Sequence, residues 1–271
     1  MFERHFLAYG VRIGLRVDCR ALLDTIDRDP KYLNLPFGWR WVEDHEPDAP
    51  VSVRYQLMTG VSGGGCPTFR LYSGVDLVAD ERRLTDVGPA LAAHAEPVIA
   101  ERAPDLLFVH AGVVGWDNRA IVMPGASFAG KTTLVRAWLE AGATYYSDEF
   151  AVLDRAGRVH PFARPLAIRD GSSAVTHRVP AAALGAASGT TPLSVGLVLV
   201  TSYRPGARWR PRRLTAAPAL LALMRHTVAA RGNPAHSMPI LKQAVSAGIA
   251  LAGPRSEARP VVSALLTHGA I

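Results

Sequence analysis

One short stretch carries the most specific chemical signal in the sequence. The pattern G-x-x-x-x-G-K-[ST] is matched at every position by Gly125-Ala126-Ser127-Phe128-Ala129-Gly130-Lys131-Thr132. Glycines let a backbone curl so that successive N–H groups point at phosphate oxygens, and a helix that begins at the lysine directs its positive end at the same anion. In such a loop the lysine contacts the β- and γ-phosphates, and the hydroxyl after it ligates Mg²⁺. The sequence therefore predicts a phosphate-binding loop in which Lys131 and Thr132 hold a nucleotide and its metal.

A carboxylate must lie near such a loop to complete the metal site. Residues 197–200 predict a later strand, but it ends in Thr201-Ser202 and supplies no acid. The nearest acids are Asp148 and Glu149, which follow Lys131 by one helix and a turn. We therefore expect one of the pair to hold Mg²⁺ and the other to take the proton of an attacking hydroxyl.

A single histidine lies on the approach to the loop. His110 follows an apolar stretch at 106–109. The residue types alone leave two interpretations open, a structural histidine at the end of a buried strand or a member of the site.

The elements around these residues follow from apolar runs and turn signals. Strands are predicted at 106–114 and 120–123, joined by a tight turn at Asp117-Asn118. A helix is expected at 132–140, closed by Ala141-Gly142. A strand at 145–153 then returns through 159–162 as a hairpin, directly downstream of the loop and helix.

The flanking segments complete an α/β prediction with two parts, a β-rich subdomain at 1–88 and a phosphate-loop domain at 89–271. The first contains strands at 7–17, 51–57 and 69–72, with a flexible turn at 62–65, and is followed by a helix at 89–102. The second ends with a strand at 195–201, an arginine-rich loop at 203–213, and helices at 218–229 and 239–252.

Composition excludes several classes of protein. The chain has 271 residues, of which 49% are hydrophobic and 20% charged, as expected of a globular protein. Its two cysteines, Cys19 and Cys66, cannot form a disulfide framework or a structural zinc site. The net charge of +7 favours anionic partners. No signal peptide or membrane span is evident, so we expect a cytoplasmic protein that does not bind a membrane.

Three segments together resemble a known family. The residues His110-Ala-Gly-Val-Val, the loop Gly125–Thr132 and the triplet Ser147-Asp148-Glu149 resemble the catalytic domain of HPr kinase/phosphorylase. They are more similar to the diverged HPr-kinase-related proteins, some of which phosphorylate precursor peptides in lasso-peptide gene clusters. The resemblance is strongest over residues 104–170. It implies an α/β fold of the phosphoenolpyruvate-carboxykinase-like type around the phosphate loop.

The resemblance also implies roles for individual residues. Residues 125–133, with Thr133 included, would bind the nucleotide phosphates, and Thr132 and Asp148 would hold Mg²⁺. Asp148 corresponds to the first acid of the family's Asp-Asp pair, which serves as catalytic base and metal carboxylate, and His110 matches a histidine near that pair. Two positions depart from the family pattern, since Glu149 replaces the second Asp and Phe128 replaces a small glycine. The family's signature for phosphorolysis is missing, which indicates a dedicated kinase.

The sequence thus predicts an ATP- and Mg²⁺-dependent kinase that phosphorylates a Ser or Thr hydroxyl of a peptide or small protein. Two alternatives stay open: a small-molecule kinase, which normally continues into a helical lid, and a non-catalytic nucleotide-binding or ATPase module of an assembly. Arg164, Arg169 and the 203–213 loop are candidate anion contacts. We do not expect nucleic acid as the partner. Members of the family are often oligomeric, so a homo-oligomer is also an open expectation.

Overall fold

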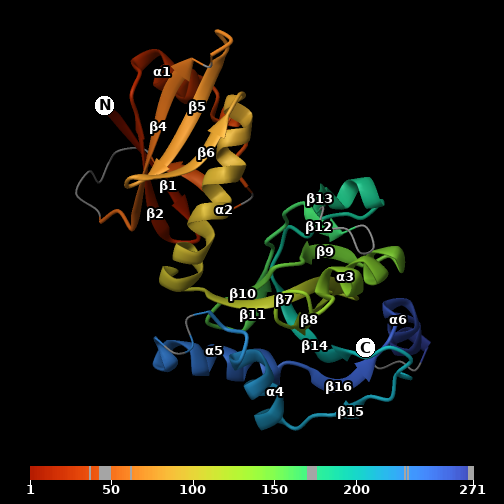
Figure 1. Cartoon of the computed structure of the whole chain (residues 1–271). Helices are drawn as coiled ribbons and strands as arrows, with labels where there is room; N and C mark the ends of the chain where they lie inside the picture. The colour runs from red at the N-terminus through yellow and green to blue at the C-terminus, as the bar shows by residue number, and fades with distance from the viewer. Residues whose placement is uncertain are drawn as a thin grey trace. The chain divides into compact units, whose positions relative to one another are not determined.

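The chain folds into two compact units, Met1–Pro104 and Asp105–Ile271 (Figure 1). The structure is a computed structural model, and it describes residues 1–36, 38–42, 50–61, 63–169, 176–228, 230 and 232–267. Both units combine sheets with helices, so the mixed α/β class predicted from the sequence is confirmed.

The first unit is built on a six-stranded sheet with the order β3-β1-β2-β4-β5-β6. All neighbouring pairs are antiparallel except β2 and β4, which are parallel. The strands are β1 (Phe2–Ala8), β2 (Val11–Val17), β3 (Trp39–Val42), β4 (Val53–Val61), β5 (Pro67–Ser73) and β6 (Asp76–Glu81). The helices of this unit are α1 (Arg20–Arg28), the 3₁₀ turn η1 (Pro30–Leu33) and α2 (Leu84–Arg102).

Helix α2 decides where the first unit ends. It packs on β4, β5, β6 and η1, and a side chain at Gly88 would collide with the main-chain carbonyl of Leu33. The helix therefore belongs to the first unit, and the boundary lies after Pro104 rather than after residue 88. It also begins five residues before the expected position 89, because Pro89 is accommodated inside its first turns.

The strand expected at 7–17 is in fact a hairpin. Tyr9 and Gly10 both adopt positive φ angles, 51° and 84°, which is the geometry of a tight two-residue turn. Tyrosine is not a usual residue at such a turn, so Tyr9-Gly10 is a weaker turn signal than Asn-Gly or Asp-Gly. The strands expected at 51–57 and 69–72 are confirmed as β4 and β5, and the described part of their connection, Gly63–Gly65, is the expected turn.

The second unit holds an eight-stranded sheet with the order β11-β10-β7-β8-β14-β16-β15, in which β9 also pairs with β7 and β11 with β14. Strands β8, β14 and β16 run parallel. The strands are β7 (Leu107–Trp116), β8 (Arg119–Pro124), β9 (Thr144–Ser147), β10 (Phe150–Leu153), β11 (Arg158–His160), β14 (Leu193–Tyr203), β15 (Arg212–Arg213) and β16 (Ile249–Arg255). A separate two-stranded sheet pairs β12 (Leu166–Arg169) with β13 (Thr176–Val179).

Helices cover both faces of the large sheet. Alternate residues of β8 point to opposite faces. Ile121 and Met123 pack with α3 (Lys131–Glu140) and α6 (Ala258–Thr267), whereas Ala120 and Val122 pack with α4 (Ala216–Met224) and α5 (Pro234–Ser246). A short 3₁₀ turn, η2 (Ala181–Leu184), adds to the α3 side. The result is a three-layer unit with two separate cores.

Most elements expected in the second unit are present. The hairpin of β7 and β8 turns at Asp117 and Asn118, whose φ angles of 46° and 56° confirm the predicted tight turn. Helix α3 confirms the prediction at 132–140. The strand expected at 145–153 is divided into β9 and β10, because the Ser147 hydroxyl accepts hydrogen bonds from the N–H groups of Glu149 and Phe150 and turns the chain.

The C-terminal helices differ more from the prediction. Helix α4 overlaps the expected range 218–229 but begins two residues before it and ends at Met224, and residue 229 is outside the described residues. The helix expected at 239–252 ends at Ser246, and the chain continues as strand β16. Gly248 allows this change because it lies against the carbonyl of Gly196 on β14, where a side chain would not fit. No helix among the described residues is long and apolar enough to cross a membrane.

Candidate active site

The predicted phosphate loop connects β8 to α3 at the carboxyl edge of the parallel strands (Figure 1). Open α/β sheets place their ligands at this edge. The Gly125 N–H donates to the His110 carbonyl at 3.2 Å, and the Ala129 N–H donates to the Ala126 carbonyl at 3.2 Å. Phe128 and Gly130 have φ angles of 67° and 79°, so the loop curls through two left-handed residues. This is the kind of backbone that presents N–H groups to an anion.

The first turn of α3 is built to receive an anion. Gly130 caps the helix without a side-chain hydrogen bond, and the first turn contains no acid. Its backbone N–H groups and the positive end of its dipole are therefore not used by a carboxylate of the helix itself. Helix α3 comes close to the sheet because β7 carries Gly112, where a side chain would collide with Val135.

Lys131 lies folded across the loop. Its ammonium Nζ donates to the carbonyls of Gly125 and Ala126, each at 3.0 Å. An ammonium has three donors, so one remains for a phosphate oxygen. Burial lowers the pKa of Lys131, and the charges of Glu149 and Asp148 oppose that shift.

Asp148 is held by three donors in a buried position. One oxygen, Oδ2, accepts from the Thr132 hydroxyl at 3.1 Å and from the Ala167 N–H at 3.2 Å, and the other, Oδ1, accepts from the Tyr145 hydroxyl at 3.0 Å. Only 6% of the surface of Asp148 is exposed. The predicted partners Thr132 and Asp148 are therefore in direct contact.

Glu149 points to a different environment, next to His110. Its Oε1 lies 3.8 Å from His110 Nδ1, and both side chains are roughly half exposed. Burial raises the pKa of Glu149, with the Lys131 charge opposing the shift. Burial lowers the pKa of His110, and the Lys131 charge adds to the effect. A carboxylate whose pKa is raised, beside an imidazole whose pKa is lowered, is suited to proton transfer.

Most of the predicted site residues line one pocket of about 520 Å³. Those in its wall are Ser127, Phe128, Gly130, Lys131, Thr132, Thr133, Asp148 and Glu149. The predicted residues Gly125, Ala126, Ala129 and His110 are not in its wall but contact residues that are, or lie next to them in the chain. Arg169 joins the wall from β12, and its guanidinium lies 4.3 Å from the centre of the exposed Phe128 ring.

Three residues of the site were not found from the sequence. Tyr145 holds Asp148 and also donates to the Arg164 carbonyl at 2.8 Å. The main-chain carbonyl of His226 accepts from the His110 N–H at 2.7 Å. Burial lowers the pKa of the His226 imidazole, and the charges of Lys131 and His110 add to the effect. Arg255 donates to the Gly130 carbonyl at 3.0 Å. None of them belongs to a motif. His226 and Arg255 reach the site through pairing between distant segments, whereas Tyr145 lies three residues before Asp148.

The oxygen atoms at the loop suit a Mg²⁺ ion that a bound nucleotide also coordinates, rather than a metal held entirely by protein ligands. Mg²⁺ is usually held by one or two carboxylates and by the phosphates of its substrate. Thr132 and Asp148 provide a hydroxyl and a carboxylate in contact. No cluster of three or more His, Cys, Asp or Glu side chains that could hold a metal by itself occurs among the described residues. This donor set therefore fits a metal whose coordination the nucleotide completes.

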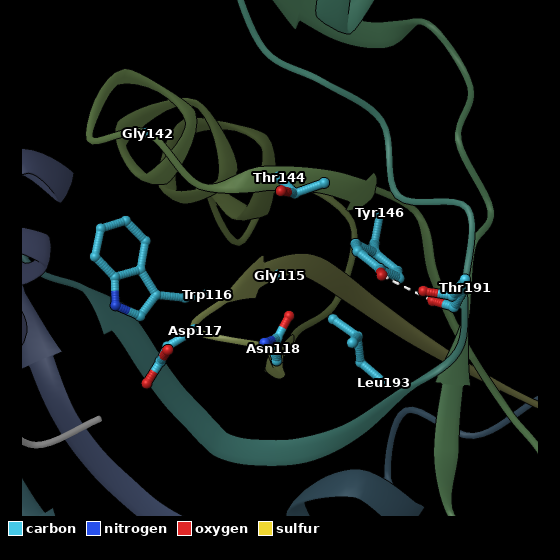
Figure 2. A pocket seen from close by; sticks show the side chains of 9 residues that line it. All are labelled: Gly115, Trp116, Asp117, Asn118, Gly142, Thr144, Tyr146, Thr191 and Leu193. Carbon is cyan, nitrogen blue, oxygen red and sulfur yellow. Dashed lines mark hydrogen bonds between the residues drawn. The ribbon is translucent and has the colours of Figure 1, made fainter.

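A second pocket, of about 640 Å³, lies at the other end of the β7–β8 hairpin (Figure 2). Trp116, Asp117 and Asn118 form one side of it, and the Tyr146 hydroxyl donates to the Thr191 carbonyl at 2.8 Å on the other side. Among the described residues, its lining contains no lysine, arginine or histidine. Its described lining therefore offers no side-chain cation to a phosphate group.

The arginine-rich loop is an exposed feature of the same unit. Arg212 and Arg213 form β15 and pair with β16. Arg204, Arg208 and Arg210 precede them on the surface. Whether they dock an anionic partner stays a prediction.

Comparisons with known proteins find a distant likeness among solved structures. The sequence matches no family model and no curated protein. Among solved structures, it is similar to the HPr(Ser) kinase/phosphatase from Coxiella burnetii with a TM-score of 0.32 and 12% identity, over 60% of this chain and 95% of that chain. At these values the likeness assigns no activity, and the chemistry must be argued from the residues of the site.

Proposed function

We propose that this protein is an ATP- and Mg²⁺-dependent phosphotransferase of the HPr-kinase-related type, acting on a Ser or Thr hydroxyl of a peptide or small protein. The observation that carries the proposal is the phosphate loop joined to an acidic pair. Thr132 of the loop donates to Asp148, and Glu149 lies in the wall of the same pocket as Lys131. A phosphate site alone needs no second acid, whereas phosphoryl transfer to a hydroxyl needs a group that takes its proton.

The loop and helix bind the phosphates. The N–H groups at the start of α3 and the remaining donor of Lys131 contact the phosphate oxygens. Thr132 and Asp148 hold Mg²⁺, which supplies positive charge against the phosphates when it is bound. These contacts position the γ-phosphoryl group at the pocket.

The contacts of the two acids favour a division of roles. Both oxygens of Asp148 are already committed to donors, which fixes the carboxylate for binding. Glu149 has its carboxylate half exposed beside His110. We therefore assign to Glu149 the removal of the proton from the acceptor hydroxyl. In the transfer, the hydroxyl oxygen forms a bond to the γ-phosphorus, the bond from that phosphorus to the ADP oxygen breaks, and the proton goes to Glu149.

Cations near Glu149 favour an anionic acceptor or transition state. The charges of Arg164 and Arg178 act on Glu149, and Arg169 lies in the pocket wall. Such groups stabilise the negative charge that spreads over a transferred phosphoryl group. The resemblance of the sequence to peptide-modifying kinases leads us to prefer a peptide or small-protein acceptor.

The structure weighs against the small-molecule-kinase alternative. Enzymes of that kind continue from the acid into a helical lid. Between 150 and 190 the described residues instead form strands β10 to β13 and the single 3₁₀ turn η2, without an α-helix. A non-catalytic nucleotide-binding module would keep the loop but would not need Glu149 in the pocket.

The test is transfer of label from γ-labelled ATP with Mg²⁺ into a size-fractionated extract of the source organism. Wild-type protein and Lys131→Ala are compared under identical conditions. We expect label in a peptide or protein fraction with wild type only. Label in the small-molecule fraction would instead establish the alternative kinase, and release of phosphate without any labelled acceptor would indicate an ATPase module.

A further inference from the structure

Arg255, the last residue of β16, is buried directly behind the phosphate loop. It is 2% exposed. Its Nη2 donates to the carbonyls of Gly130 at 3.0 Å and Ala129 at 3.5 Å, and its Nη1 donates to the Ser256 carbonyl at 3.0 Å. Its Nε lies 3.4 Å from the Thr201 hydroxyl on β14. The side chain therefore ties the loop to the ends of two parallel strands.

The hydrogen-bond partners of this guanidinium are neutral: three carbonyls and a hydroxyl. The guanidinium also lies 6.0 Å from the centre of the Tyr203 ring, and the charge of Glu257 acts on it, but none of the ion pairs found among the described residues involves Arg255. A buried charge without a carboxylate is costly to maintain, and a hydrophobic side chain of similar size is often as stable or more stable at such a position. Stability of the fold alone therefore does not explain why an arginine lies here.

The position of Gly130 fits the presence of this arginine. A Cβ atom on Gly130 would lie 2.5 Å from Arg255 Nη2, so the guanidinium occupies the space that a side chain would need. Gly130 also has a φ angle of 79° and is the N-cap of α3. The missing side chain thus lets a cation approach the loop from behind.

The hydrogen bonds to the carbonyls help to fix where the loop's N–H groups point, together with the Leu134 N–H of α3, which donates to the Gly130 carbonyl at 3.1 Å. In a trans peptide unit the C=O and the N–H point in opposite directions. Arg255 binds the carbonyls of Ala129 and Gly130, so the N–H groups of Gly130 and Lys131 in the same peptide units point away from it. Gly130 and Lys131 line the pocket, and Arg255 is not among its lining residues.

We propose that Arg255 is a positioning residue for the phosphate groups of the nucleotide. It fixes the two peptide units of the loop so that their N–H groups face the phosphates, and its charge balances the phosphates through the loop without touching them. This inference rests on the proposed nucleotide site and adds a residue that no motif contains.

The test compares Arg255→Met and Arg255→Lys with Arg259→Met, a control that removes an arginine from an exposed ion pair with Glu140 on α3. Two quantities are measured for each protein: the melting temperature without ligand, and the Kd for ATP with Mg²⁺ by calorimetry. We expect Arg255→Met to melt at or above the wild-type temperature but to bind ATP about tenfold or more weakly. Arg255→Lys keeps the charge but not the planar fork of donors, so its Kd should lie between the two. The control should bind like wild type.

A second readout separates positioning from a structural role. In the transfer assay with γ-labelled ATP, KM for ATP should rise in both Arg255 variants, while kcat at saturating ATP changes much less. A lower melting temperature with an unchanged Kd and an unchanged KM would show a purely structural arginine and overturn the inference. If Arg255→Met does not fold, the comparison of Arg255→Lys with wild type still decides it. Failure of wild type itself to bind ATP would instead refute the proposed nucleotide site, on which the inference depends.

Discussion

At the scale of single residues, the two adjacent acids have different surroundings despite being neighbours in the chain. Asp148 is buried and bound by Thr132, Tyr145 and the Ala167 N–H, whereas Glu149 is half exposed beside His110. Ser147 causes the difference, since its hydroxyl turns the chain between β9 and β10. Two carboxylates of equal chemistry can thus serve different functions.

Substitution of each acid separates the two roles. We expect Glu149→Gln to reduce phosphoryl transfer by about 10²–10⁴-fold, because it removes a general base, while ATP affinity stays close to wild type. Asp148→Asn should weaken binding of ATP in the presence of Mg²⁺ but have little effect on binding of ATP without the metal. Calorimetric titrations with and without Mg²⁺, together with labelled transfer, measure both. The opposite pattern would exchange the two assignments.

Tyr145 should matter more than an ordinary buried aromatic residue. Tyr145→Phe removes the hydroxyl that donates to Asp148 and to the Arg164 carbonyl, and leaves two buried acceptors with one donor fewer. We expect a loss of about 1–3 kcal/mol in the free energy of unfolding and weaker Mg²⁺-dependent ATP binding. Urea titration and calorimetry check the two effects. The matched control is Tyr72→Phe in the first unit, which should leave ATP binding unchanged.

His110 gives the site a dependence on pH. Its pKa is lowered in the folded protein by burial and by Lys131, with His226 and Glu149 also nearby. The unfolded chain therefore binds this proton more readily, so the stabilising contribution is present above the unfolded pKa of about 6.5 and is lost as the pH falls through the folded pKa.

We accordingly expect His110→Gln to lose less stability than wild type between pH 7.5 and pH 5. Melting temperatures measured across this range for both proteins give the comparison. Equal losses in the two proteins would show that His110 is not the group responsible.

At the scale of elements, local patterns predicted what depends on neighbouring residues. The loop, helix α3, the β7–β8 turn and the acid pair all lie within about 40 residues of one another and carry motifs or turn signals. The hairpin at Tyr9-Gly10 and strand β16 were missed, because their turn and strand depend on tertiary contacts rather than on local propensity.

The contacts that complete the site could not be predicted for the same reason. Arg255 lies 125 residues from its partner Gly130, and the segment that contains His226 pairs with β7 through an isolated bridge between Val109 and Thr227. Nothing in one sequence with 27 arginines distinguishes Arg255 from the others. Only the parallel register of β8, β14 and β16 brings it to the loop.

The packing of α2 is the element-scale feature with the sharpest steric constraint. Gly88→Ala would place a methyl group against the Leu33 carbonyl. This carbonyl belongs to the main chain, so it can move away only if the backbone is distorted. We expect a loss of at least about 1–3 kcal/mol in the free energy of unfolding, as for other overpacked sites. Gly64→Ala, where a Cβ would meet nothing within 4 Å, is the control and should be nearly neutral. Urea unfolding followed by tryptophan fluorescence distinguishes them, and equal midpoints would contradict this packing.

At the scale of the whole molecule, the fold gathers positive potential around the phosphate loop. Its sources include the start of α3 with the Lys131 ammonium, and the Arg255 guanidinium, which binds carbonyls of the loop. The pocket wall also contains Arg136 and Arg169, together with the carboxylates of Asp148 and Glu149. This arrangement supports the proposal that the pocket binds a nucleotide with its metal and leaves one acid for the acceptor.

Titration of ATP with Mg²⁺ into wild type and Lys131→Ala is the sharpest test of nucleotide binding at the phosphate loop. In the proposed site Lys131 supplies a charge-assisted hydrogen bond to the phosphates, and such a bond contributes about 1.5–3 kcal/mol. We predict saturable binding of one ATP per chain to wild type, and a Kd at least tenfold higher for Lys131→Ala with an unchanged fold by circular dichroism. Equal binding by the two proteins, or no binding to wild type, would contradict the account.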